Sequence, residues 1–339
     1  MRVSAVLAGG LVLGLCAGEV SAQHLGVVDV LGRRVMLLDA SDGRVVNANY
    51  ITQAVGPIGL ATEALQVEQE IWISDSGNAV RRYSLDGKAF IGSIVGPFNP
   101  PMNTPQGMAY DGTTVFVACS QVQQHGLFAS WVTKLNPDGS PAGLFTVPDD
   151  RHRYDIALDG SNLLVTDVDD QALDLHSTSS FALLARIDSF PQTFGHNPTQ
   201  VARLSTGEIA LGTTKGLRIY DSAGVLVGQH YADVHIKGVG ELGTGELVLG
   251  IDSRLVAYDL ATGTERTLAS GVNTRFVSEI TGATVCVADA NADGSLTPAD
   301  FSAWVSAFNT QGPQCDQNDD GVCSPADFSA WVANFNAGC

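Results

Sequence analysis

The sequence predicts an all-β fold, a six-bladed β-propeller whose last blade joins strands from both ends of the domain, followed by a small α-helical module. Three observations lead to this prediction. Short β-rich runs recur between residues 25 and 282, separated by turn residues. The N-terminal runs supply only three of the four strands of a blade, and the last run supplies the fourth. Residues 286–339 contain an acidic loop and an aromatic helix twice, in almost the same letters.

Residues 1–22 have the features of a secretory signal peptide. Arg2 gives a positive start, residues 3–17 are apolar, and Val20-Ser21-Ala22 forms a small-residue cleavage site. The apolar stretch is too short to span a membrane, which takes about 20 residues. We therefore expect a mature chain that starts near Gln23, is secreted or attached to the cell surface, and does not insert into a membrane.

The charge of the chain limits its partners. The 339 residues carry a formal net charge of −18. Phosphates of nucleic acids and anionic lipids need a basic surface, so neither is an expected partner. The same charge attracts divalent cations.

An inner-strand motif recurs six times along the first domain. Its copies are PIGLATEA (57–64), PQGMAYDG (105–112), RYDIALDG (153–160), PTQVARLS (198–205), KGVGELGT (237–244) and RFVSEITG (275–282). We align them on Ala61, Ala109, Ala157, Ala202, Gly240 and Ser278. After each of the first five copies follow a second strand, a third strand with its turn, and usually an outer run. Four strands in a repeat of roughly 40–50 residues form a propeller blade.

The ends of this domain indicate how the ring closes. The sixth copy has no strands after it, whereas the N-terminus offers three, in LGVVD (25–29), RRVMLLDASDG (33–43) and RVVNANYI (44–51). Together they make one blade, so we predict six blades over residues 23–282 and a short linker at 283–285. A seven-bladed ring with one divergent blade is the alternative. The pattern resembles NHL-type and related six-bladed propellers.

Three histidines mark the face where outer strands connect to the next inner strands. His152, His196 and His235 occupy similar places in three successive connections, so they are candidate ligands of a transition metal, helped by Asp155 or Gln200. Ordinary polar rim residues are the favoured alternative. The recurrent Asp29, Asp75 and Asp167, at the ends of second strands, are expected to have a structural role, because a catalytic residue has no reason to recur in each blade.

Each copy of the repeated ending fits a twelve-residue calcium loop. A hard cation takes about six to eight oxygen ligands, so oxygens converge from alternate loop positions around a glycine at position 6. In the first loop the predicted ligands are Asp289, Asn291, Asp293, Ser295, Thr297 and Asp300. In the second they are Asp316, Asn318, Asp320, Val322, Ser324 and Asp327. Acidic turns without calcium are the alternative, which the match of both copies disfavours.

A capped helix follows each loop. Thr297 and Ser324 are N-cap residues, each followed by proline and, three positions on, by aspartate. An apolar face recurs at helical spacing, and we expect the two copies to pack against each other. These faces consist of Phe301, Trp304, Val305 and Phe308 in the first helix and Phe328, Trp331, Val332 and Phe335 in the second.

The last 54 residues hold four cysteines, which in an exported segment predict a disulfide framework: Cys286, Cys315, Cys323 and Cys339. Three connectivities are open. We favour a Cys286–Cys339 bond that joins the ends of the module and a Cys315–Cys323 bond that braces the second loop. Cys119, in the first domain, is expected to be a buried small hydrophobic residue.

Residues 286–339 resemble a dockerin, the duplicated calcium module that docks onto cohesin domains, and the terminal NAGC resembles the GC-type variety. The resemblance implies two calcium ions and a cohesin-like partner. The chain departs from the familiar contacts, because Pro298-Ala299 and Pro325-Ala326 replace polar pairs and the helices lack basic residues.

The sequence therefore predicts a secreted binding protein that is anchored to a cohesin-like or cell-envelope partner. Its channel face would take an unknown ligand, with carbohydrate or peptide as candidates. The alternative is a metal-dependent lactonase or lyase that acts on carbohydrate-derived substrates. A serine-type catalytic triad finds no support in the sequence, because there is no nucleophile elbow.

Overall fold

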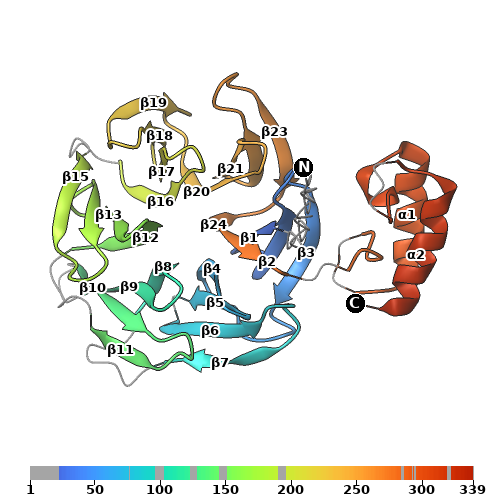
Figure 1. Cartoon of the computed structure of the whole chain (residues 1–339), viewed down its shortest axis with the longest axis horizontal. Helices are drawn as coiled ribbons and strands as arrows, with labels where there is room; N and C mark the ends of the chain where they lie inside the picture. Colours follow the sequence, from blue (N-terminus) through green and yellow to red (C-terminus); the bar gives the residue numbers. More distant parts are fainter. Residues whose placement is uncertain are drawn as a thin grey trace, which may run out of the picture.

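The computed structural model describes residues 23–75, 77–95, 103–122, 128–144, 151–189, 196–283, 286–291, 293, 295–318 and 322–338. Six four-stranded antiparallel sheets surround a central axis, as Figure 1 shows. The predicted six-bladed propeller is confirmed. The predicted signal peptide lies outside the described residues. Within the part of the chain that the structure describes, no helix is long and apolar enough to cross a membrane.

The blades are numbered here by their inner strands in chain order. Blade 1 has β4 (Ala61–Val67), β5 (Glu70–Asp75), β6 (Ala79–Ser84) and β7 (Phe90–Ile94). Blade 2 has β8 (Pro105–Tyr110), β9 (Val115–Val122), β10 (Phe128–Leu135) and β11 (Pro141–Leu144). Blade 3 has β12 (Arg153–Asp159), β13 (Asn162–Asp167), β14 (Ala172–Ser177) and β15 (Leu183–Ser189).

The remaining blades follow the same plan. Blade 4 has β16 (Pro198–Arg203), β17 (Ile209–Thr213), β18 (Gly216–Tyr220) and β19 (Leu226–His230). Blade 5 has β20 (Ile236–Glu241), β21 (Leu247–Ile251), β22 (Arg254–Tyr258) and β23 (Glu265–Ser270). Blade 6 has β24 (Thr274–Thr281) as its inner strand, followed by β1 (Gln23–Asp29), β2 (Arg34–Asp39) and β3 (Val45–Thr52).

Blade 6 closes the ring as predicted. β24 pairs antiparallel with β1, with Val277 opposite Val27 and Ser278 opposite Gly26. The seam is tight at Gly26, where an added Cβ would lie 2.5 Å from the Cδ1 atom of Ile280. The Asp29 carboxylate also accepts the backbone N–H of Asn273 at 3.0 Å. Both ends of the domain are thus joined by ladder and side-chain bonds.

The apolar core lies between neighbouring blades. Middle strands are buried almost throughout, as in β17 and β21, because both of their faces are covered by adjacent sheets. Outer strands are more exposed to solvent, as in β15, which is largely exposed. Trp72 and Trp131 are the largest fully buried side chains, and they fill one cluster between blades 1 and 2.

The recurrent aspartates have the predicted structural role. Asp29, Asp75 and Asp167 are buried, and each accepts backbone N–H groups of the following turn. Each also pairs with an arginine, at 3.0 Å for Asp29, 3.2 Å for Asp75 and 3.3 Å for Asp167. These contacts fix the turn after each second strand.

The strand registers correct one part of the predicted alignment. Ala61 pairs with Asp75 at the start of its ladder, as Pro105 pairs with Cys119. The residue equivalent to Ala109 is therefore Leu65, opposite Trp72, and not Ala61. The predicted alignment places the first copy four residues too early, because Gly59-Leu60-Ala61 resembles Gly107-Met108-Ala109 of the second copy although the two triplets occupy different places in their ladders.

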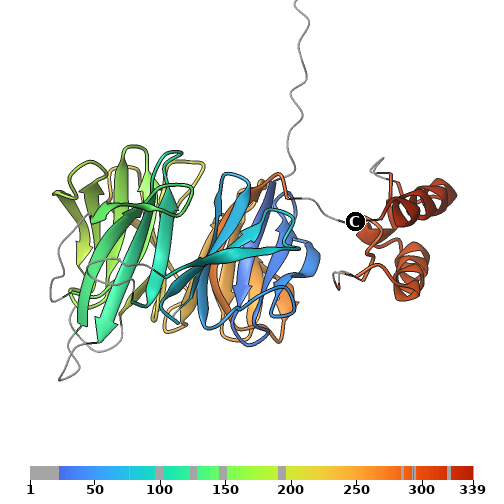
Figure 2. The same cartoon turned by 90° about the horizontal axis from the view of Figure 1, so that it is seen from below.

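The C-terminal module has the predicted capped helices α1 (Pro298–Thr310) and α2 (Pro325–Ala337), with a short 3₁₀ turn η2 (Pro313–Cys315) between them. Thr297 with Asp300 and Ser324 with Asp327 form capping boxes. Figure 2 shows the module beside the propeller. Asn49 of β3 donates to the backbone carbonyl of Asp293 at 3.0 Å.

Two indoles hold the module together. The Trp304 N–H donates to the carbonyl of Cys315 at 3.1 Å, and the Trp331 N–H donates to that of Ala288 at 3.1 Å. Each helix therefore bonds the residue just before the other copy's loop. The two aromatic faces pack against each other as expected, with the Phe301 and Trp331 ring centroids 5.2 Å apart and those of Trp304 and Phe328 5.5 Å apart. Phe301 and Phe328 nevertheless stay 41% and 45% exposed, because so small a core buries the indoles more fully than these rings.

We predict that Asp29→Ala lowers the free energy of unfolding by about 2–4 kcal/mol, because it leaves the N–H groups of Gly32 and Asn273 and the Nε of Arg34 without their acceptor. Asp75→Ala is the matched control, since Asp75 has a comparable turn and arginine, and its bonds in the described structure stay within blade 1. The loss for Asp29→Ala should exceed that of the control by about 1 kcal/mol in urea unfolding. Equal losses would show that the seam bond adds nothing.

Candidate functional site

The inner strands of all six blades line the axis and carry the same irregularity. In each, three residues oppose two of the neighbouring strand, which is a β-bulge. The bulge places two successive residues of every blade around the axis. The first of each pair form ring A: Thr62, Gln106, Tyr154, Thr199, Lys237 and Arg275. The second form ring B: Glu63, Gly107, Asp155, Gln200, Gly238 and Phe276.

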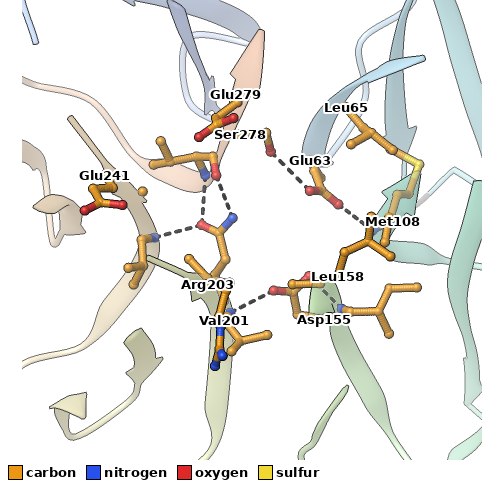
Figure 3. A pocket seen from close by; sticks show the side chains of 18 of the residues that line it. Glu63, Leu65, Met108, Asp155, Leu158, Val201, Arg203, Glu241, Ser278 and Glu279 are labelled. Carbon is orange, nitrogen blue, oxygen red and sulfur yellow. Dashed lines mark hydrogen bonds between the residues drawn. The ribbon is translucent and has the colours of Figure 1, made fainter. Parts of the chain in front are cut away.

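Ring B ties the blades together by hydrogen bonds to backbone N–H groups that follow the bulges. Glu63 accepts the N–H of Met108 in blade 2 and, at 3.1 Å, the hydroxyl of Ser278 in blade 6. Asp155 accepts the N–H of Val201 in blade 4 at 2.8 Å. Figure 3 shows these contacts around the axis.

Gln200 of blade 4 bonds to residues of both blade 5 and blade 6. Its Oε1 accepts the N–H of Val239 at 2.7 Å and that of Val277 at 2.8 Å, while its Nε2 donates to the Val277 carbonyl at 2.7 Å. Gly107 provides room for the Asp155 carboxyl, because an added Cβ would lie 2.1 Å from its Oδ1 atom. The polar residues of ring B, Glu63, Asp155 and Gln200, therefore connect the blades by hydrogen bonds, and we call these three residues the girdle.

Burial changes the acidity of the two ring B carboxyls. It raises the pKa of Asp155 to about 7. Burial also raises the pKa of Glu63, and the neighbouring Asp155 charge raises it further. A desolvated carboxyl prefers its neutral form, so this pair retains protons at pH values where exposed carboxyls have lost them.

A cavity of about 300 Å³ opens on the side of ring B toward the ends of the inner strands (Figure 3). Glu63, Asp155 and Gln200 line it, together with apolar groups such as Met108 and Leu158. Its charged lining also includes Glu241, Glu279 and Arg203, and the arginine is paired with Asp159 at 3.2 Å. We call this space the acidic cavity.

A second cavity, of about 270 Å³, lies on the opposite side, where the inner strands begin. Its lining comprises Val30, Leu60, Ala61, Thr62, Gln106, Tyr154 and Arg275. Arg275 Nη1 donates to the Tyr154 hydroxyl oxygen at 2.8 Å, and the Thr62 hydroxyl donates to Gln106 at 3.2 Å. Lys237 stands on the adjacent inner strand. Its pKa is lowered by burial and by the charge of Arg275. We call this space the basic cavity.

The structure does not bring the three predicted histidines together. His152 lies edge-on to Tyr154, with ring centroids 6.1 Å apart, and burial lowers its pKa. His235 has its pKa lowered by burial and by the charges of Lys237 and Arg275. His196 lines another cavity, among residues of blade 4 and the connection that follows it.

Among the residues that the structure describes, no three His, Cys, Asp or Glu side chains are grouped so that they could hold a metal ion. For the histidines the reason is geometric, because equivalent places on successive blades are spread around the ring. Similar places in the sequence therefore do not converge on one point.

The two acidic loops share one hydrogen-bond pattern. In the first, the Asp300 carboxylate accepts the N–H of Asn291 at 3.3 Å and that of Thr297 at 2.7 Å. In the second, Asp327 accepts the N–H of Asn318 at 3.4 Å and that of Ser324 at 2.7 Å. The shared pattern ties the third and ninth residues of each loop to the aspartate at its end.

The side chains of the first loop accept hydrogen bonds from the backbone of the loop itself. Asp289 and Asn291 both accept the N–H of Asp293, at 3.1 and 3.0 Å, and Asp293 accepts that of Ser295 at 2.9 Å. Carboxylate, amide and carbonyl oxygens are the ligands that calcium prefers, so the chemistry of these residues fits that ion. The predicted ligand Asp320 lies outside the described residues.

Cys315 and Cys323 form the disulfide favoured from the sequence. Cys286 is disulfide-bonded as well, and its predicted partner Cys339 lies outside the described residues. Cys119 is a free thiol, fully buried in β9. Burial raises the pKa of this thiol, as expected for a small core residue.

Comparison with known proteins shows the fold. No family model matches the chain, and no curated protein matches its sequence. A chain of a nidogen/laminin complex is similar over 77% of this chain and 100% of its own, with a TM-score of 0.59 and 15% identity. The extracellular domain of a hybrid two-component system from B. thetaiotaomicron is similar over 74% of this chain and 33% of its own, with a TM-score of 0.51 and 14% identity.

A gluconolactonase from Xanthomonas campestris, XC5397, is similar over 68% of this chain and 83% of its own, with a TM-score of 0.50 and 17% identity. At such low identity these likenesses concern the fold alone. The chain is thus a six-bladed β-propeller protein with a polar axial channel and a C-terminal pair of helices.

Sequence reasoning missed the girdle because the first copy of the motif was placed out of register. In the observed register, Glu63, Asp155 and Gln200 occupy equivalent places in the repeat. The recurrence of a polar residue at this place is the sequence feature that could have predicted the girdle.

We predict that Glu63 and Asp155 make the stability of the wild type fall more steeply than that of Glu63→Gln as pH rises from about 4 to about 7. In this window the two carboxyls hold more protons in the folded than in the unfolded state, because the folded pKa of Asp155 is about 7 and that of Glu63 is also raised. Burial lowers the pKa of His152, His176 and His235, and these groups act in the opposite direction in both proteins. The contribution of the carboxyls should amount to roughly 1–3 kcal/mol in urea unfolding at saturating calcium. Glu63→Gln keeps an acceptor for Met108 and should flatten the profile.

The control for this experiment is Glu279→Gln, which changes an exposed carboxyl. It should leave the slope unchanged. A wild-type slope equal to that of Glu63→Gln would contradict the prediction.

Proposed function

We propose that the protein is an exported binding protein in two parts. The propeller takes a small ligand in its axial channel. The C-terminal module binds two calcium ions and docks onto a cohesin-like or cell-envelope partner. The observation that carries the anchoring part is the duplicated loop and helix, whose copies share cap, hydrogen-bond pattern and mutual indole bonds.

The acidic loops favour calcium over an empty turn. Each brings several carboxylates and an asparagine into one short segment, without a lysine or arginine in residues 286–339. Like charges at such short range repel, and a divalent cation would remove that cost. Asp289, Asn291, Asp293 and Asp300 would hold one ion, and Asp316, Asn318, Asp320 and Asp327 the other. Ser295, Thr297, Val322 and Ser324 would complete the two shells.

The surface of the helices supports a docking role. Phe301 and Phe328 lie with ring centroids 6.0 Å apart, each from the first turn of its helix. Val332 is also exposed. An exposed apolar group of this kind on a small module is typical of a protein interface. Because both copies contribute equivalent residues, the partner could bind in either of two orientations.

A location outside the cytoplasm agrees with several features. Disulfides such as Cys315–Cys323 persist in oxidising compartments. The N-terminal residues have the pattern of a signal peptide, and one of the structural neighbours is an extracellular domain.

A second candidate function is an enzyme that acts on carbohydrate-derived substrates. The observation that favours it is the pair Glu63 and Asp155 at the acidic cavity, because carboxyls with raised pKa serve as general acids. Hydrolysis of aldonolactones by the purified protein, lost in Asp155→Asn, would establish this function. Absence of turnover on lactones and uronides would leave the binding function.

We predict that the mature protein binds two calcium ions and that the double variant Asp289→Ala, Asp316→Ala binds none. Removing the first ligand of a loop takes away both charge and a coordinating oxygen. Equilibrium dialysis with metal analysis measures the stoichiometry. Asp111→Ala is the control, since Asp111 caps an exposed turn of the propeller. Equal calcium in wild type and double variant would refute the calcium-dependent anchor.

A further inference from the structure

We infer that the basic cavity binds the carboxylate of a small organic anion, held by the unused edge of the Arg275 guanidinium with Lys237 beside it. The inference rests on the proposed binding function and names the ligand class for one end of the channel.

The first argument concerns charge pairing. The chain has 36 acidic and 18 basic residues, so carboxylates for pairing are abundant. Most described arginines have one, among them Arg34, Arg81, Arg186 and Arg218. Within the described residues, Lys237 donates only to the Asp252 carbonyl at 3.1 Å and the Asn273 side chain at 2.8 Å. In the described structure these two neighbouring cations therefore donate hydrogen bonds to neutral acceptors, and the Asp252 carboxylate acts on Lys237 through its charge alone.

The second argument concerns their closeness. Lys237 and Arg275 are equivalent ring A residues of blades 5 and 6. Gly238, the next residue after Lys237, packs on the Arg275 carbonyl so closely that an added Cβ would lie 2.1 Å from it. Partly buried like charges on adjacent strands repel each other, and a bound anion would offset both charges.

The third argument concerns the guanidinium itself. Arg275 Nη1 donates a hydrogen bond to the Tyr154 hydroxyl oxygen, and in the described structure the Nε and Nη2 atoms of Arg275 have no protein acceptor. Elsewhere the chain uses this Nε–Nη2 edge to hold carboxylates. Arg82 binds Glu70 at 2.7 and 2.7 Å, and Arg186 binds Asp174 at 2.8 and 2.9 Å. The planar fork matches a carboxylate with two parallel bonds.

The walls of the cavity define the rest of the ligand. Tyr154 accepts from Arg275, so its O–H remains a donor, and Gln106 accepts from Thr62, so its amide remains a donor too. Val30 and Leu60, the latter 63% exposed, add apolar surface at the rim. A volume of about 270 Å³ suits a small molecule. The ligand class is a short organic acid with an apolar or hydroxylated body, such as a branched alkanoate or a uronate.

The test is calorimetric titration of the calcium-loaded mature protein with isovalerate, glucuronate, inorganic phosphate and the neutral analogues isovaleramide and glucose. We expect at least one carboxylate to bind the wild type and to bind Arg275→Gln at least ten-fold more weakly. Lys237→Met should weaken binding by a smaller factor. The control Arg254→Gln removes an exposed arginine that already has a partner, Glu265, and should bind like wild type.

Several results would overturn the inference. Among probes that bind, they are neutral analogues that bind as well as their acids, carboxylate affinity that survives Arg275→Gln, and phosphate that binds more tightly than every carboxylate. Neutral-sugar binding unaffected by Arg275→Gln would refute the carboxylate site and leave the proposed channel-binding function intact. Failure of every probe to bind the wild type overturns the inference, while the calcium content of the same preparation judges the anchor separately. Unchanged melting temperatures confirm that the variants fold.

Discussion

The antiparallel pairing of β24 with β1 is the constraint on which the propeller depends. A blade cannot bury both of its faces unless it has a neighbour on each side, and only a closed ring gives every blade two neighbours. By joining the end of the domain to its beginning, the pairing of Val277 with Val27 puts six inner strands around one axis. The bulges of those strands then lie in register, and the axis becomes a place where residues from distant parts of the chain meet.

The bulges leave backbone N–H groups without partners in their own sheet, and they also place the side chains that accept these groups. An extra residue in each inner strand releases backbone N–H groups near the axis, where unpaired donors are costly. Glu63, Asp155 and Gln200 accept them from neighbouring blades. The girdle divides the channel into an acidic cavity toward the strand ends and a basic cavity toward the strand starts. The two ends of the channel differ in charge, so we expect the acidic cavity and the basic cavity to bind different classes of ligand.

The C-terminal module solves the problem of a very small core by duplication. Neither loop and helix could enclose an indole alone, but two copies exchange indole hydrogen bonds across their interface. A disulfide between Cys315 and Cys323 adds a constraint where little apolar surface is available. Duplication also leaves Phe301 and Phe328 together on the outside, so one device supplies both stability and an exposed apolar surface.

The sequence by itself determined what local chemistry encodes. Blade number and closure followed from the strand repeat, and the caps at Thr297 and Ser324 from side chains that bond to adjacent backbone. Only the tertiary structure decided which residues meet. It placed Glu63 in the girdle, spread His152, His196 and His235 around the rim, and left Phe301 and Phe328 exposed. The physical reason is that a one-residue bulge or the crossing of two helices redirects side chains without altering the pattern of letters that predicts the elements.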